Sequence, residues 1–223
     1  PLQRANAQYG RYLYLFNMQR YVVSDEVMME VEKNIKFAEQ TGKLVSIYDH
    51  HFTAGFFHFF RRELDEAERH LHLCLELAER MGDPVRISRA ANYLMLSARM
   101  RGDVKLTQSY FETVLSTTWA GPMADYRFQV QACQAWIAWR AGKLEEAREL
   151  AAEALEKLQK IPGKFPLQWI AVFLLLSITI TERQLTKTVE LAQLLLDPSQ
   201  MILPRDLTDA LEKGLHAAQQ NND

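Results

Sequence analysis

The sequence predicts an all-α protein, an array of about five helix-turn-helix repeats followed by a C-terminal helix. Three observations predict it: a forty-residue internal period, apolar residues at helical spacing, and turn residues at the unit boundaries. Because one helical hairpin cannot bury its apolar face alone, successive hairpins must stack on their neighbours. A compact helical bundle is the alternative, and it accounts poorly for a period kept over four units.

The period is visible in short segments that begin the second helix of each repeat. SDEV starts at 24, LDEA at 64 and LEEA at 144, and VKLT at 104 fills the remaining slot. A fifth, weaker copy is offset by 41 residues, since ELAQLLL at 190 aligns with ELAAEAL at 149. Self-similarity of this length is typical of repeat architectures.

The predicted repeats cover residues 5–42, 44–82, 84–120, 122–161 and 165–197, and the terminal helix covers 204–220. Within a repeat, apolar residues follow the steps of three and four that indicate an amphipathic helix. The second repeat shows this spacing at Leu64, Ala67, Leu71, Cys74, Leu75 and Ala78. We expect a single repeat domain over 1–223, a fragment of a larger protein because the chain begins at Pro1 and not at methionine.

Residues at the boundaries predict where helices begin and end. Ser24 is a candidate N-cap, with Asp25 and Glu26 in the first turn behind it. RGD at 101 and RAGK at 140 each supply a turn glycine, and MGDP at 81 places Pro84 where a helix cannot continue.

The most apolar segment is WIAVFLLLSITIT, residues 169–181. It is shorter than the about 20 residues that cross a bilayer, so it predicts a buried helix and no membrane association. Further repeats or a second copy of the chain would cover it, so a homo-oligomer is one of the expectations.

Composition excludes several classes of function. With 26 Lys and Arg against 28 Asp and Glu, the net charge is −2, and we expect no nucleic-acid binding by this region. Cys74 and Cys133 form no C-x-x-C pair, which favours buried thiols, no metal site and a reducing cytoplasm. No phosphate-binding loop motif occurs, and we expect no cofactor.

At LDEAERHLHLCLELAERMGDP (64–84) and AWRAGKLEEARELAAEAL (138–155) the chain resembles tetratricopeptide repeat proteins. Small residues stand where that family packs two helices closely, at Gly55, Ala67, Cys74, Ala135, Ala147 and Ala154. The forty-residue length resembles the sensor arrays of MalT-like bacterial transcription regulators and related signalling ATPases. The resemblance implies a right-handed superhelix whose first helices line a concave groove.

The groove predicted from this register is aromatic at both flanks with arginines between them. Phe52, Phe56 and Phe59, spaced by four and three, form one stripe on a helix face. The candidate binding residues are Tyr12, Phe16, Phe52, Phe56, Phe59, Arg89, Asn92, Arg99, Trp136, Trp139 and Arg140. Either a ligand or partner covers these rings, or the rings pack against one another; the sequence leaves both open.

The stretch DHHFTAGFFHFF at 49–60 raises the question of a metal site. His51 and His58 are seven residues apart and share a helix face, with Asp49 or His50 as possible further ligands. No H-E-x-x-H or comparable spacing is present, so the pattern favours packing of His51 and His58 against the partner helix.

These observations favour a non-catalytic binding scaffold for a protein, peptide or small-molecule effector. The resemblance implies the ligand-sensing or protein-docking region of a bacterial transcriptional or signalling regulator. A peptide-pheromone (quorum-sensing) receptor is the alternative, with Asn92 holding the peptide backbone and an arginine its carboxylate. We expect no enzyme, because packing already explains the cluster of Asp49 and the three histidines.

Overall fold

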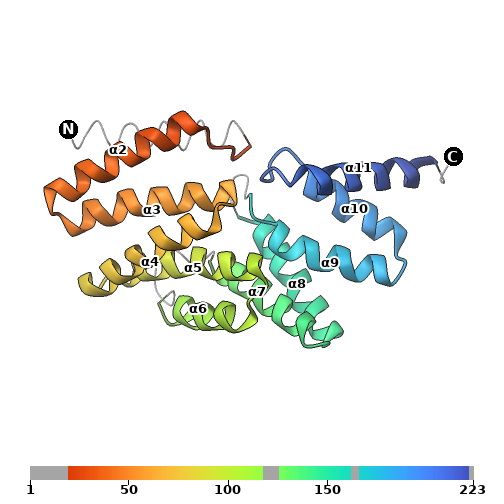
Figure 1. Cartoon of the computed structure of the whole chain (residues 1–223). Helices are drawn as coiled ribbons and strands as arrows, with labels where there is room; N and C mark the ends of the chain where they lie inside the picture. The colour runs from red at the N-terminus through yellow and green to blue at the C-terminus, as the bar shows by residue number, and fades with distance from the viewer. Residues whose placement is uncertain (1–19, 118–125, 162–165, 221–223) are drawn as a thin grey trace. The chain divides into compact units, whose positions relative to one another are not determined.

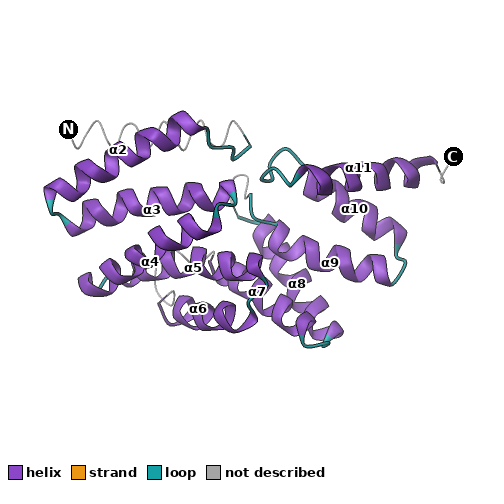
Figure 2. Ribbon diagram, viewed as in Figure 1, coloured by secondary structure: helices purple, strands orange, loops and turns teal. Residues whose placement is uncertain are grey.

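The computed structural model describes residues 20–117, 126–161 and 166–220, which form ten α-helices and no strand (Figures 1 and 2). The helices are α2 (Asp25–Thr41), α3 (Leu44–Arg61), α4 (Leu64–Met81), α5 (Pro84–Arg101), α6 (Val104–Thr117), α7 (Tyr126–Arg140), α8 (Leu144–Gln159), α9 (Trp169–Thr181), α10 (Leu185–Leu196) and α11 (Arg205–Gln220). The predicted all-α class is confirmed.

Helices that follow one another in the chain pack against one another, within two compact units, 1–127 and 128–223. In the first unit each helix from α2 to α6 contacts the next, and α3 also contacts α5 (Figure 1). In the second unit α8, α9, α10 and α11 follow the same rule, and Gln131 of α7 donates to Glu153 of α8 at 2.6 Å. Consecutive packing is the arrangement that a helical repeat array requires.

Helices α2, α3, α4, α5 and α7 are each followed by a residue in the left-handed conformation, and these residues are separated by twenty positions or, in the last case, by forty. Gly42, Arg62, Gly82, Gly102 and Gly142 have φ between 61° and 79°. After Gly82 the amide of Asp83 bonds the carbonyl of Ala78 at 3.1 Å, a Schellman ending that satisfies the last carbonyls. The forty-residue period is therefore two helices of similar length with a sharp stop after each.

The predicted N-cap at Ser24 is present, and Asp83 is a second N-cap that the sequence analysis did not name. The Ser24 side chain accepts a hydrogen bond from the amide of Val27, with Asp25 and Glu26 in the first turn of α2. Asp83 caps α5 by accepting from the amide of Arg86 at 3.0 Å, and Pro84 occupies the first turn, where its missing N–H is not needed. These bonds satisfy amides that have no partner inside the helix.

Asp83→Ala should lower the free energy of unfolding by about 1 kcal/mol at pH 7, the usual value of a lost N-cap. The hydrogen bond from the Arg86 amide is the main cause that lowers the pKa of Asp83. A lowered folded pKa means that the carboxylate stabilises above its ordinary pKa, and that this contribution is lost as pH falls below about 4. Urea unfolding at pH 7 and pH 3 should show the difference from wild type shrinking, and Asp83→Asn, which keeps an acceptor, should lose less.

Small residues allow α3 and α4 to approach closely, as the sequence predicts. A Cβ added to Gly55 would lie 2.8 Å from Cγ of Leu71 and 3.2 Å from the carbonyl oxygen of Ala67. Cys74 and Cys133 are buried and unbridged, and burial raises the pKa of the Cys74 thiol.

The apolar segment 169–181 is the helix α9, which buries most of its side chains against α8 and α10. The buried-helix prediction is therefore confirmed. None of the helices in the described ranges is long and apolar enough to cross a membrane.

Candidate functional site

The predicted aromatic stripe of α3 is largely a core and not an open wall. Phe52 and Phe59 are 2% and 0% exposed, and only Phe56 is half-buried. All three rings surround Tyr93 of α5, with centroid distances of 5.7, 5.1 and 5.5 Å for Phe52, Phe56 and Phe59. Of the two alternatives that the sequence left open, the structure therefore has the rings of Phe52 and Phe59 packed against one another, in the contact between α3 and α5, and not open to a ligand.

The predicted groove residues of α5 are also mostly buried. Asn92 is fully buried and Arg99 is 7% exposed, so neither lies on an open surface. Arg89 is half-buried, and its guanidinium carbon lies 4.0 Å from the centroid of the Phe52 ring, a cation–π contact. Within the first unit, the structure therefore leaves Phe56 and Arg89 as the partly exposed members of the predicted set.

The remaining predicted residues fall elsewhere. Trp136, Trp139 and Arg140 lie on α7 in the second unit, with both indoles half-buried and Arg140 exposed. The Arg140 guanidinium carbon is 5.6 Å from the Trp136 centroid. Tyr12 and Phe16 lie outside the described residues.

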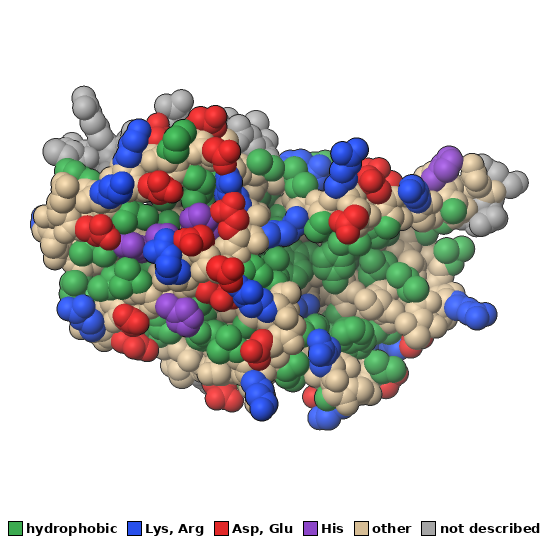
Figure 3. Space-filling model, in the orientation of Figure 1, with side chains coloured by type: hydrophobic (Ala, Val, Ile, Leu, Met, Phe, Trp, Pro, Cys, Tyr) green, Lys and Arg blue, Asp and Glu red, His purple; other side chains and the backbone are tan. Residues whose placement is uncertain are grey.

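A second candidate site, which the sequence did not predict, is a cavity of about 380 Å³ lined by α2, α3 and α4. Its lining combines three histidines with both acidic and basic side chains, namely His51, His58, His70, Glu32, Glu39, Glu66, Lys36 and Arg69, above apolar residues of α2 and α3. In Figure 3, histidine, acidic and basic side chains gather over these three helices. It is the main concentration of imidazole groups in the described part of the chain.

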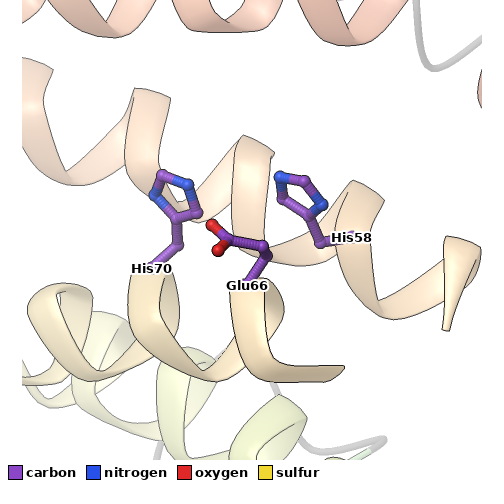
Figure 4. Close-up of side chains that lie close together, drawn as sticks. All are labelled: His58, Glu66 and His70. Carbon is purple, nitrogen blue, oxygen red and sulfur yellow. The ribbon is translucent and has the colours of Figure 1, made fainter. Parts of the chain in front are cut away.

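Three of the lining side chains, His58, Glu66 and His70, lie close together (Figure 4). Each offers one metal-ligating atom, and these atoms all lie within 4.8 Å of one another. Glu66 and His70 are four residues apart on α4 and share its face, while His58 reaches them from α3. In Figure 4 the Glu66 carboxylate lies between the two imidazole rings.

A chain of contacts assigns the protons of His70 and His51. Arg69 Nη2 lies 2.9 Å from His70 Nε2, and a guanidinium can only donate, so this nitrogen accepts. A neutral His70 then carries its proton on Nδ1 and donates to His51 Nδ1 at 2.8 Å. The proton of His51 is consequently on Nε2, which faces Glu39 Oε1 at 3.4 Å, longer than an ordinary hydrogen bond.

The electrostatics agree with neutral imidazoles in this chain. Burial is the main cause that lowers the pKa of His70, to about 3, and the neighbouring Arg69 guanidinium lowers it further. Burial also lowers the pKa of His51, although the Glu39 carboxylate opposes this. Both rings are therefore neutral near pH 7, and His51 Nδ1 has the lone pair that accepts from His70.

His58 is oriented by a carboxylate. Its Nδ1 lies 2.6 Å from Glu63 Oε2, and an ionised carboxylate can only accept, so Nδ1 carries a proton; in the neutral ring the lone pair is then on Nε2. The ring of His58 also stacks on that of His70, with centroids 5.6 Å apart and planes 10° apart. The predicted packing of His51 and His58 against the partner helix is thus present, with His70 as the residue that both contact.

Arg69 is the resident cation of the cavity. It donates to Glu66 Oε2 from Nη2 at 2.6 Å and from Nε at 2.9 Å. This is an exposed pair three residues apart on one helix, with side chains 61% and 50% exposed, a kind that contributes under about 1 kcal/mol. Its guanidinium can therefore leave Glu66 and His70 at little cost.

Asp49 and His50, the possible further ligands considered beside His51 and His58, do not line the cavity. Asp49 lies 3.5 Å from Arg86, and His50 Nδ1 contacts the carbonyl of Ser46 at 2.8 Å, both away from the cavity. The residues missed are Glu66 and His70, whose spacing of four on a helix was the available signal. This spacing indicates a site only once the packing of α3 against α4 brings His58 next to Glu66 and His70.

By class, then, the chain is an all-helical protein of consecutively packed hairpins, with a histidine–carboxylate cavity in its first unit. No known protein-family model matches it, and no curated protein shows significant sequence similarity to it.

Proposed function

We propose that this chain is a non-catalytic binding scaffold of tetratricopeptide-like repeats, the ligand-sensing or protein-docking region of a bacterial transcriptional or signalling regulator. The observation that supports it best is the packing of α3 against α5, the first helices of two successive hairpins. This packing brings the half-buried Phe56 and Arg89 to neighbouring helices of one repeat surface.

The chemistry of this surface favours a partner that carries a carboxylate or phosphate beside an apolar group. The guanidinium of Arg89 is held over the Phe52 ring, so part of its conformational freedom is already lost before binding. Arginine pairs with planar anions through two parallel hydrogen bonds, and Phe56 offers an apolar contact next to it.

Charge reversal at Arg89 tests the proposal. Affinity capture from extracts of the host cell, followed by native mass spectrometry, should show a reproducible ligand or partner on the wild-type chain. Arg89→Glu should reduce its amount at least about tenfold, because a matched charge pair becomes a repulsive one. Arg80→Glu, the same change at an exposed position of α4, should bind normally.

Arg99 is unsuitable for this test because it is buried, and reversing its charge would unfold the helix pair. Retention of every partner by Arg89→Glu would refute the assignment of this surface. Asn92, which the peptide-pheromone alternative needs at the surface, is fully buried. This burial argues against the alternative. A bound peptide would nevertheless be identified by its mass in the same measurement.

A further inference from the structure

We propose that His58, Glu66 and His70 bind a divalent transition-metal ion of the zinc class. The inference goes beyond the proposed function and uses none of its residues. Two imidazoles and one carboxylate suit Zn²⁺ and its neighbours among the transition metals, whereas Mg²⁺ and Ca²⁺ prefer all-oxygen sites. The three side chains converge in a cavity large enough for the ion and the water molecules that complete its coordination.

Both imidazoles already present the same nitrogen to the cavity. Nδ1 of His58 is held by Glu63 at 2.6 Å, and Nδ1 of His70 is held by His51 at 2.8 Å. In the neutral form each ring therefore has its lone pair on Nε2, where that of His70 accepts from Arg69 until a metal displaces the guanidinium. A metal would meet two donors in the correct tautomer without any rearrangement of protons.

The partners behind the imidazoles are those that support metal ligands. A ligating histidine usually donates its other N–H to a carboxylate or another acceptor, which fixes the ring and raises its basicity. Glu63 is the carboxylate that accepts from Nδ1 of His58. Behind His70 the acceptor is His51, whose far nitrogen faces Glu39 at 3.4 Å.

Arg69 occupies the place of the ion in this arrangement. Its guanidinium bridges Glu66 and His70, two of the three ligands, so the site already holds a positive charge. Tetrahedral zinc at 2.0–2.1 Å needs donors about 3.3 Å apart. The ligand atoms lie within 4.8 Å of one another, so binding requires Arg69 to turn outward and the three side chains to close in by up to about 1.5 Å, for which the half-exposed Glu66 has room.

Zinc titration of the whole chain, after removal of bound metal with a chelator, tests the inference. Isothermal titration with zinc chloride should give one saturable site per chain at micromolar zinc, and zinc should raise the thermal midpoint. Glu66→Gln and His58→Gln should each weaken binding at least about tenfold. Arg69→Met should tighten it several-fold, because the competing cation is gone.

Matched controls on α4 are Glu76→Gln and His72→Gln, both exposed and outside the cavity, which should bind zinc like the wild type. Circular dichroism without metal shows whether each variant folds. If His58→Gln does not fold, the variants of the exposed residues Glu66 and Arg69 still test the site. Binding only at millimolar zinc, unchanged binding in Glu66→Gln, or weaker binding in Arg69→Met would each overturn the site. Affinity capture by the Arg89 surface is measured separately, so either proposal can fail alone.

Discussion

Phe59→Ala should lower the free energy of unfolding by about 3–5 kcal/mol, the range measured when a buried aromatic side chain is truncated. Phe59 is fully buried, and its ring meets Tyr93 and Phe60 edge to face, with centroids 5.5 and 5.4 Å away. Alanine removes both ring contacts and leaves a cavity that the rigid helix backbones cannot close. Urea unfolding followed by circular dichroism measures the loss.

Phe37→Ala is the matched control, because this phenylalanine of α2 is 47% exposed. Surface truncations of this kind usually change stability by about 0.5 kcal/mol or less. If Phe59 were a groove residue, its truncation would resemble that of Phe37 and would reduce partner capture instead. A loss under about 1 kcal/mol would therefore restore the groove interpretation that the burial of Phe59 contradicts.

The helices could be predicted because their signals are local. The apolar spacing of α4, the capping side chain Ser24 and the stop at Gly82 each act within one or two turns. Arg62 shows why residue type alone is insufficient, since it takes the left-handed conformation without being glycine. Only its position, twenty residues after Gly42, indicates that a helix must end there.

The candidate binding surface was harder to predict, because the exposure of its side chains depends on a neighbouring helix. The spacing of Phe52, Phe56 and Phe59 places them correctly on one face of α3, but it cannot show that Tyr93 fills the space opposite. A stripe of rings fits an open groove and a closed contact equally well. The contact between α3 and α5 decides between them.

The histidine cavity was missed for a related reason. His58 lies on one helix, and Glu66 and His70 lie on the next, so no single helical pattern contains all three. Their meeting depends on how closely α3 and α4 approach. Gly55 controls that distance, since it is the position where any side chain would collide with Leu71.

Gly55→Val should accordingly destabilise the chain by about 3 kcal/mol, at the upper end of ordinary overpacking. Its Cβ would lie 2.8 Å from Cγ of the fully buried Leu71, and the two further methyl groups add volume to this closely packed contact. Gly55→Ala should lose only about 1 kcal/mol, because the gain in helix propensity, about 1 kcal/mol, offsets part of the clash. Gly214→Ala is the control, since Gly214 is exposed in the middle of α11 and an added Cβ meets nothing within 4 Å. This variant gains helix propensity without a clash, so it should not lower the free energy of unfolding.

A double mutant shows whether the clash is the cause. Leu71→Ala alone should cost about 2–5 kcal/mol, but in the Gly55→Val background part of that cost should vanish, since the valine fills the space that leucine leaves. Strictly additive losses in urea unfolding would mean that Gly55 is not at the point of contact. Gly55 also affects the spacing of His58 from Glu66 and His70, because it lies where α3 contacts α4. A folded Gly55→Val chain should therefore bind zinc more weakly than Gly55→Ala, and this difference would link the packing of the two helices to metal binding in the cavity.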